Sequence, residues 1–530
     1  MRDFNSLPDD VPSLKRLVLE GDRENEHLKL QLARLRRWKF GQSSEQLEKS
    51  GQMALGLVEL QSIISITGQE DGQEAASNDA QPTPGAEAAE EPKNRPVRRK
   101  KLPEHFERNE NRIEPEECTC ADCGGDIEDF GEPDVSEQLE VRTVTFTVTR
   151  HIRPKKRCRK CRNIVQAPAP SRPIEKSFAG ATLLALILVW KYGFALPLYR
   201  QCQIFAHAGL KISRTTLMQW VGATSALLGP LVEALADHVL AAPNMNGDDS
   251  PFKVLAPGTG KTKKGYLWTY VRDGRAWGAR DPPAVWYQYS PSREGRHPQR
   301  HLKNYAGKLQ VDGYAGYEAL FVPPKPDVPA RIIEVGCWAH GRRGFFELFV
   351  ATNSPTAKEA LDRIGNLYDI EDAIRGKSPD IRLAVRKERS VPLLNELHGW
   401  MLQVRTEVDN SSGLAKAFDY VLKRWTQLTR YTEDGRLEID NNSAERTVRG
   451  PAVGKKNYLF FGSDTGGERA AIIYSLVETC KLNGIDPQRY LEYVIARIAD
   501  HPINRIEELL PWNVADELNQ PEQVKQAMAA

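Results

Sequence analysis

The sequence lacks any long uninterrupted run of apolar residues. Its longest, ATLLALILVW (181–190), is far shorter than the roughly 20 residues that a membrane-spanning helix needs, and the first residues, MRDFNSLPDD, are too polar for a secretory signal. We therefore expect a buried helix there and no membrane partner. Net charge is also nearly absent, at +2 for 530 residues, so bulk charge does not indicate nucleic acid. Internal repeats are lacking too.

Cysteine is scarce, with eight in the whole chain. Four of them are spaced as CxxC pairs, which favours metal ligation in a reducing compartment over disulfide bonds. We therefore expect a cytoplasmic protein. Cys202, Cys337 and Cys480 stand alone in the sequence and are predicted to be buried thiols.

The paired cysteines predict a small zinc-binding module. They are Cys120 and Cys123 in CADC, and Cys158 and Cys161 in CRKC. Two such knuckles can supply four thiolates to a tetrahedral structural zinc, with Cys118 as an alternative ligand. The intervening run 135–154 alternates like strands, so a β-hairpin can return the second knuckle to the first.

Positive charge is concentrated in short clusters, which an acidic segment at 69–91 offsets. The cluster RPKKRCRKCR (153–162) surrounds the second knuckle. A rigid module with this charge suits contact with a phosphate backbone, through Lys155, Lys156 and Arg159. A merely solvated face is the alternative.

The N-terminal region predicts a helix and then a linker. Apolar residues between 11 and 47 recur at heptad spacing, with Asn25 at a seam position, which is typical of a short coiled coil. Such a seam favours a homo-oligomer, and an amphipathic helix packed on the rest of the chain is the alternative. Residues 67–96 have almost no large apolar side chains and are predicted to be a disordered linker.

The rest of the chain predicts a helical segment followed by an α/β domain. KISRTTLMQWVG (211–222) has a polar start before an amphipathic run, which fits either the second helix of a helix-turn-helix or plain helical packing. From about 243, aromatic and β-branched runs bounded by Gly and Pro predict strands, and helical patterns return at 341–431 and 468–510. Strands interrupted by helices indicate a multidomain α/β protein with a helical insertion.

The expected domains follow from these changes in composition and hydrophobic pattern along the chain. In order, they are a helical or coiled-coil segment at 1–50, a disordered linker with a basic end at 51–103, the zinc-binding module at 104–170, a helical and potentially DNA-binding segment at 171–242, a catalytic domain at 243–475 with its insertion at about 345–432, and a C-terminal helical tail at 476–530.

Three separate acidic positions suit a site for hard divalent cations. Asp312 ends an apolar-alternating strand in KLQVDGYAGY, and Glu445 lies on a helix that should start near Asn441. Asp248 and Asp249 are neighbours in a third segment and would point to opposite faces of a strand, so only one should face the metals. Two magnesium ions about 4 Å apart on such carboxylates can catalyse phosphodiester transfer. Asp440, just before the helix, is an alternate ligand.

The run IDNNSAERTVRG…GKKNYLFFGSDTGGERAA (439–471), together with LQVDGYAGY, CWAHGRRGF, GYLWTYVRD and SRTTLMQW, resembles the insertion-sequence-66 family of bacterial transposases. The resemblance covers nearly the whole chain. It implies a ribonuclease-H-like fold and an Asp-Asp-Glu triad that moves a DNA element by cleavage and strand transfer, with Mg2+ or Mn2+ at the catalytic site. It also implies that the protein acts at the bacterial nucleoid on element ends and target DNA, as a multimer, with small accessory proteins encoded by the same element.

Carried onto this chain, the resemblance makes Asp248, Asp312 and Glu445 the catalytic and magnesium-binding residues, with Asp249 as the alternate to the first. The family typically has Asp-Glu-Thr at the first acid, whereas this chain has Asp-Asp-Ser (248–250). The departure keeps a second hypothesis open, in which the chain is a catalytically silent DNA-binding protein derived from such a transposase.

Basic residues near these acids are candidate DNA contacts, because arginine can grip phosphate with two hydrogen bonds. The segment around Phe460 and Phe461 would form a DNA-facing loop that begins at its two lysines. Surface charges or salt bridges are the alternative for each. The candidates are His340, Arg342, Arg343, Arg446, Arg449, Lys455 and Lys456.

Overall fold

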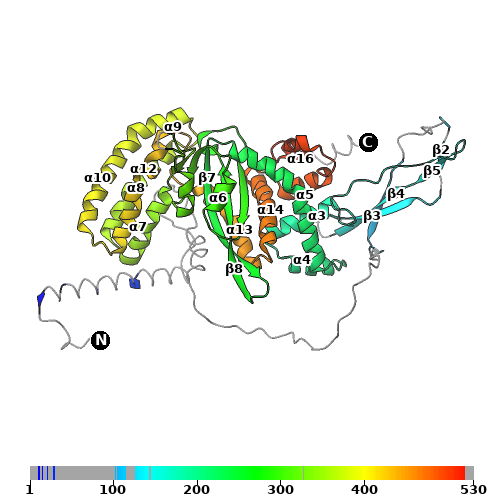
Figure 1. The fold of residues 1–530 in the computed structure, drawn as a ribbon, viewed down its shortest axis with the longest axis horizontal. Helices are drawn as coiled ribbons and strands as arrows, with labels where there is room; N and C mark the ends of the chain where they lie inside the picture. The colour runs from blue at the N-terminus through cyan, green and yellow to red at the C-terminus, as the bar shows by residue number, and fades with distance from the viewer. Residues whose placement is uncertain are drawn as a thin grey trace.

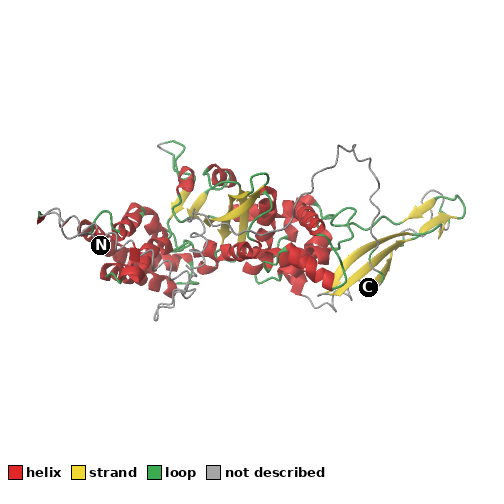
Figure 2. Ribbon diagram, turned by 90° about the horizontal axis from the view of Figure 1, so that it is seen from below, coloured by secondary structure: helices red, strands yellow, loops and turns green. Residues whose placement is uncertain are grey.

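The computed structural model describes residues 106–114, 124–125, 127–129, 131–142, 145–325 and 328–519, with a few single positions before residue 105. The predicted coiled coil and linker, 1–103, lie outside this part apart from those positions. Strands β1–β6 form one end of the molecule, a five-stranded sheet with packed helices forms the middle, and a helical group forms the other end (Figures 1 and 2).

The strands of the cysteine-bearing end form two small sheets, ordered β1-β4-β3 and β2-β5-β6. The alternating run predicted as a hairpin does form one, because β3 pairs antiparallel with β4 from Asp134↔Arg153 to Arg142↔Thr145. The six strands are β1 (Glu107–Arg112), β2 (Ile127–Asp129), β3 (Asp134–Arg142), β4 (Thr145–Arg153), β5 (Lys155–Cys158) and β6 (Ile164–Gln166).

Three helices connect this end to the central sheet: α3 (Ala181–Leu188), α4 (Leu198–His207) and α5 (Arg214–Leu240). The apolar run predicted as a buried helix forms α3, most of which is buried. The polar start of α5 is a helix cap, since the Ser213 side chain accepts the N–H of Thr216 at 3.0 Å. Within the described ranges, no helix is long and apolar enough to cross a membrane.

The central sheet has the order β11-β10-β7-β8-β9. Strands β7, β8 and β9 run antiparallel as consecutive hairpins, whereas β10 lies parallel to both β7 and β11. The strand bounds are β7 (Asn244–Ala256), β8 (Lys261–Arg272), β9 (Ala284–Ser290), β10 (Gly307–Gln310) and β11 (Ile332–Val335).

Helices cover both faces of this sheet. Helix α6 (Arg296–His301) lies on one face, where His301 contacts the rings of Trp268 and Tyr270. Helices α13 (Asn442–Tyr458) and α14 (Asp464–Leu482) lie on the other.

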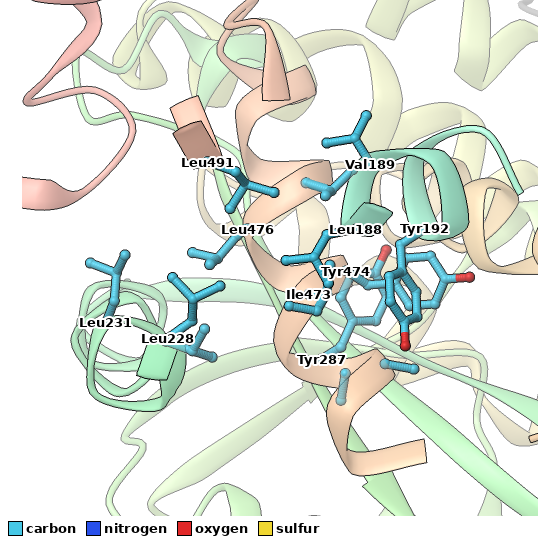
Figure 3. Packing of buried hydrophobic residues seen from close by; sticks show 14 of the residues in the cluster. Leu188, Val189, Tyr192, Leu228, Leu231, Tyr287, Ile473, Tyr474, Leu476 and Leu491 are labelled. Atoms are coloured by element: carbon cyan, nitrogen blue, oxygen red, sulfur yellow. The ribbon is translucent and has the colours of Figure 1, made fainter. Parts of the chain in front are cut away.

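Helix α14 is the centre of the main core. Figure 3 shows side chains from α3, α5, β9 and α15 (Pro487–Arg497) gathered around it. Leu228 of α5 and Leu476 of α14 are completely buried, and burial of each contributes roughly 2 kcal/mol. The predicted C-terminal segment, 476–530, therefore begins inside α14, a helix that packs on the central sheet.

The helical insertion lies between β11 and α13 and has its own hydrophobic core. It begins earlier than the predicted position of about 345, because β11 ends at Val335 and a helix starts at Trp338, whose buried indole donates to Leu428 O at 2.9 Å. Its helices are α7 (Trp338–Thr352), α8 (Pro355–Ala373), α9 (Pro379–Val385), α10 (Val391–Glu407), α11 (Gly413–Lys423) and α12 (Trp425–Thr429).

A buried ion network fixes this insertion to the segment that leads into α13. Arg386 binds both oxygens of Glu371, at 2.8 and 2.6 Å, and donates to Leu437 O at 2.8 Å. Arg382 contacts Glu371 and donates to Glu438 at 2.7 Å. Because Arg382, Arg386 and Glu371 are almost fully buried, solvent cannot replace a lost partner.

Arg386→Met should destabilise the fold by about 3–5 kcal/mol, because it leaves the buried Glu371 carboxylate short of a partner. Urea unfolding of the full chain, followed by far-ultraviolet circular dichroism, measures the loss. Lys358→Ala is the control, since it removes only an exposed ion pair with Asp362 and should leave the unfolding midpoint unchanged. Equal effects of the two substitutions would contradict the role given to the network.

Candidate active site

Two neighbouring strands bring Asp248 and Asp312 to the same level of the sheet. In the parallel pairing of β7 with β10, Asn246 lies opposite Gln310, so the acids two residues further along both strands are adjacent. Asp312 follows the end of β10 in a tight turn, where Gly313 takes a φ of +83°. The turn is held by Tyr420, which donates to Asp312 O at 2.7 Å.

The start of α13 is fixed to β7 beside Asp248 by one buried side chain. Asn441 donates to Gly247 O at 2.8 Å and accepts from Asn246 at 3.0 Å. Its backbone N–H donates to Cys337 Sγ at 3.2 Å. The helix starts at Asn442, close to the predicted position, and the Asn441 side chain before it makes no capping bond, because it is used to bind the strand.

Glu445 lies one turn into α13, and its side chain is 2% exposed. Its Oε1 has no hydrogen-bond partner. Burial raises the pKa of Glu445 to about 7; Arg343 opposes the shift, while Asp440 and Asp312 increase it.

The ionised form of Asp248 is disfavoured in the same way. Burial raises the pKa of Asp248 well above its ordinary value, and repulsion from Asp312, Asp249 and Glu445 adds to the rise. Asp248, Asp312 and Glu445 are thus close enough for their charges to interact. Mutually repelling carboxylates with an unpartnered buried oxygen are what a hard divalent cation would stabilise, so these residues fit magnesium.

The two alternate acids, Asp249 and Asp440, form hydrogen bonds with other residues. Asp249 lies on the opposite face of β7, as predicted, and both its oxygens accept from Arg293, at 2.9 Å each. The Arg293 guanidinium stacks 3.6 Å from the centre of the Tyr314 ring. Asp440 accepts from the backbone and side chain of Asn442, and burial raises its pKa to about 6.

Two of the basic candidates on α7 face the carboxylates. His340 Nδ1 lies 3.5 Å from Glu445 Oε1, and burial and the Arg343 charge lower its pKa to about 4. Arg343 has two buried guanidinium nitrogens, Nε and Nη2, without a hydrogen-bond partner. Arg342 is different, because it is buried against Phe346 and is not displayed for DNA contact.

The segment predicted as a DNA-facing loop from Lys455 begins as helix, because α13 continues to Tyr458. Lys455 is turned inward, where it donates to Pro251 O at 2.7 Å and burial lowers its pKa to about 8. Phe461 is buried and pairs with β7 at Val254. The exposed face of α13 instead carries Arg446, Arg449 and Lys456.

The second cysteine knuckle has the geometry of a metal-binding turn. Cys158 ends β5 and its Sγ accepts the N–H of Cys161 at 3.4 Å. The register pairs Cys158 with Ile127 of β2, a few residues beyond the first knuckle. Cys120 and Cys123 themselves lie outside the described residues.

The basic residues of this knuckle have acidic neighbours. Lys155 lies 3.5 Å from Asp134, and Lys156 pairs with Glu114 at 2.7 Å, so part of their charge is compensated locally. Arg159 is exposed. Among the candidates of this module, Arg159 is the exposed residue, whereas Lys155 and Lys156 are half-buried.

Sequence reasoning missed the surroundings of Cys337, which was expected to be an isolated buried thiol. It is buried, but its sulfur, His340 Nδ1 and a Glu445 oxygen lie within 4.8 Å of one another. The Cys-x-x-His spacing in CWAH was the available signal. Asn246 and Arg293 were also missed, because only the fold brings them to the acids.

Comparison with protein families gives four matches along the chain. The Transposase IS66 family matches residues 176–469, and the IS66 C-terminal element matches 475–512. The zinc-finger binding domain of transposase IS66 matches 117–162, and a module described as Transposase C of IS166 homeodomain matches 27–110.

Full-length relatives occur in Sinorhizobium fredii. The uncharacterized protein y4hP is 40% identical over 92% of this chain and 88% of its own length. The uncharacterized protein y4jD is 36% identical over 97% of this chain and 98% of its own length. Similarity therefore extends through all the regions described above.

The raised pKa of Glu445 predicts a pH dependence of stability in magnesium-free buffer. Because the folded chain holds this proton up to about pH 7 and the unfolded chain releases it near 4.5, the contribution is fully present below 4.5 and is lost as pH rises through 7. Its size is on the order of 3 kcal/mol. Denaturant unfolding across this range should show the slope in the native protein and a flatter profile in Glu445→Gln.

Glu359→Gln, on an exposed turn of α8, is the matched control and should keep the native slope. A native slope that survived in Glu445→Gln would mean that another group titrates.

Proposed function

Because the chain belongs to the IS66 family of transposases and so has a transposase-type DNA-binding role, we propose that it cleaves the ends of its insertion element and joins them to target DNA. The catalytic residues are Asp248, Asp312 and Glu445. The observation that carries this proposal is their convergence from two strands and a helix, with a buried Glu445 oxygen that has no partner.

Each residue has a distinct part in the proposed reaction. The three carboxylates would hold Mg2+, or Mn2+, which would supply activation of an attacking water or hydroxyl and stabilisation of the leaving oxygen. His340 and Arg343 orient the scissile phosphate, since Arg343 has nitrogens available for an anionic oxygen. Asn441 keeps Glu445 in register with Asp248 through its bond to Gly247.

A ribonuclease-H-like fold is part of the proposal. It is supported by three antiparallel strands followed by two parallel ones, with Asp248 on β7 and Asp312 just after the end of the neighbouring β10. The third acid comes from α13, which packs on β7 and β8. The helical insertion separates Asp312 from Glu445 along the chain. The fold nevertheless brings the two carboxylates close enough for their charges to interact.

DNA should lie along the exposed face of α13. Arg446, Arg449 and Lys456 share this face over ten residues, which is about 15 Å of helix, starting next to Glu445. Such a row of positive charge suits contact with the phosphates of a strand. We infer that it guides the strand to the carboxylates.

The zinc-binding module would add a second DNA contact. Its family match supports zinc binding, and we propose Cys120, Cys123, Cys158 and Cys161 as the ligands of a structural ion. Lys155, Lys156 and Arg159 would then contact the phosphate backbone. We further propose that the protein acts at the bacterial nucleoid as a homo-oligomer that bridges two ends, aided by accessory proteins of the element.

Asp312→Asn and Glu445→Gln should each abolish magnesium-dependent cleavage while DNA binding is retained, because they remove metal ligands and leave the basic surfaces intact. The assay uses purified protein with the DNA that flanks the gene, with and without magnesium. Asp249→Asn is the discriminating variant: it breaks the pair with Arg293 and should leave measurable cleavage, whereas Asp248→Asn should leave none.

Specific binding without cleavage in the native protein, with or without magnesium, would favour the catalytically silent alternative. Unchanged magnesium-dependent cleavage by Asp312→Asn would contradict the proposed triad.

Arg449→Gln and Lys456→Gln should each weaken DNA binding and lower the slope of log affinity against log salt concentration by about 1, because each removes one phosphate contact. Lys455→Gln is the matched control: its ammonium is turned onto Pro251 O, so the slope should not change. Fluorescence anisotropy over a salt series measures the slopes. A lower slope for Lys455→Gln alone would mean that the DNA does not lie along the exposed face of α13.

A further inference from the structure

Cys337 and His340 bring a sulfur and an imidazole nitrogen to the same oxygen of Glu445. His340 Nδ1 lies 3.3 Å from Cys337 Sγ and 3.5 Å from Glu445 Oε1. All three potential ligand atoms lie within 4.8 Å of one another. Cys337 is buried immediately before α7, while His340 keeps a partly exposed edge through which an ion could enter.

The two separations from His340 Nδ1 match those between the ligands of tetrahedral zinc. Bond lengths of about 2.3 Å to sulfur and about 2.0–2.1 Å to nitrogen or oxygen put neighbouring ligand atoms about 3.3–3.6 Å apart. A thiolate, a neutral imidazole and a carboxylate are also the ligand types that zinc prefers, whereas magnesium prefers oxygen alone.

The observed hydrogen bonds leave part of this group unsatisfied. A single Nδ1 faces both the sulfur and the carboxylate oxygen, and it can carry only one proton. If that proton is donated to Cys337, Glu445 Oε1 is left buried without a partner, as is observed. A neutral imidazole, as the lowered pKa of His340 favours, has a lone pair to offer an ion.

We propose that Cys337, His340 and Glu445 form a second zinc site, separate from the four-cysteine module. Cys337 would bind as the thiolate, with its proton released to solvent. Three protein ligands leave the fourth position open for water or a phosphate oxygen. The site rests on the proposed function only in sharing Glu445 and His340: an ion held there takes an oxygen that the magnesium site would use and the imidazole that would otherwise orient the phosphate.

Zinc content per purified full-length chain, measured by plasma mass spectrometry after removal of loosely bound metal, tests the site. We expect two ions in the native protein and one in Cys337→Ser or His340→Gln. Cys480→Ser removes an equally buried cysteine on α14 and should keep two. One ion in the native protein, unchanged by Cys337→Ser and by His340→Gln, would overturn the proposal.

Cobalt substitution provides a second readout that does not depend on counting ions. In Cys118→Ser/Cys120→Ser/Cys123→Ser/Cys158→Ser/Cys161→Ser, which lacks every cysteine of the zinc-binding module, a weak thiolate-to-cobalt absorption from one sulfur should remain, and adding Cys337→Ser should abolish it. A band that persisted without Cys337 would reject the site. Neither measurement uses DNA, so loss of the zinc site leaves the Asp312→Asn cleavage test standing, and failure of that test leaves the zinc site standing.

Discussion

The hydrogen bonds of Asn441 join α13 to β7 at the point where three carboxylates converge. Asn441 donates to Gly247 O and accepts from Asn246, while its backbone N–H reaches Cys337 Sγ. Repulsion between the acids works against this junction, as the raised pKa values of Asp248 and Glu445 indicate. Without a buried polar anchor, α13 could relieve that repulsion by moving away from the strand.

The helical insertion supports the same junction from the other side. Arg382 and Arg386 contact Leu437 O, and Arg382 also binds Glu438, only a few residues before Asn441. The insertion is thus more than a long connection between the second and third acids. Its buried arginines hold the entry into α13 where the two strands need it, which links packing far from the sheet to the geometry of the site.

Much of this arrangement could be predicted from local sequence, because strand and helix patterns are local. The strands around Asp312, the opposite faces of Asp248 and Asp249, and the helix of Glu445 follow from alternation and turn residues. The family resemblance is confirmed by matches over most of the chain, whereas the predicted domain boundaries and site residues stay predictions.

What the sequence could not reveal depends on contacts between distant segments. Nothing in the pair Lys455-Lys456 says which lysine faces inward, because that is decided by a carbonyl on β7. Cys337 looked solitary because Glu445 is more than a hundred residues away along the chain.

The central claim is that Asp248, Asp312 and Glu445 together hold a divalent cation. Electron paramagnetic resonance of Mn2+ titrated into the full-length protein counts bound ions directly, without DNA. The account predicts saturable binding in the native protein that is lost or strongly weakened in Asp248→Asn, Asp312→Asn and Glu445→Gln but kept in Asp249→Asn. Equal Mn2+ binding by the native protein and all four variants would contradict it.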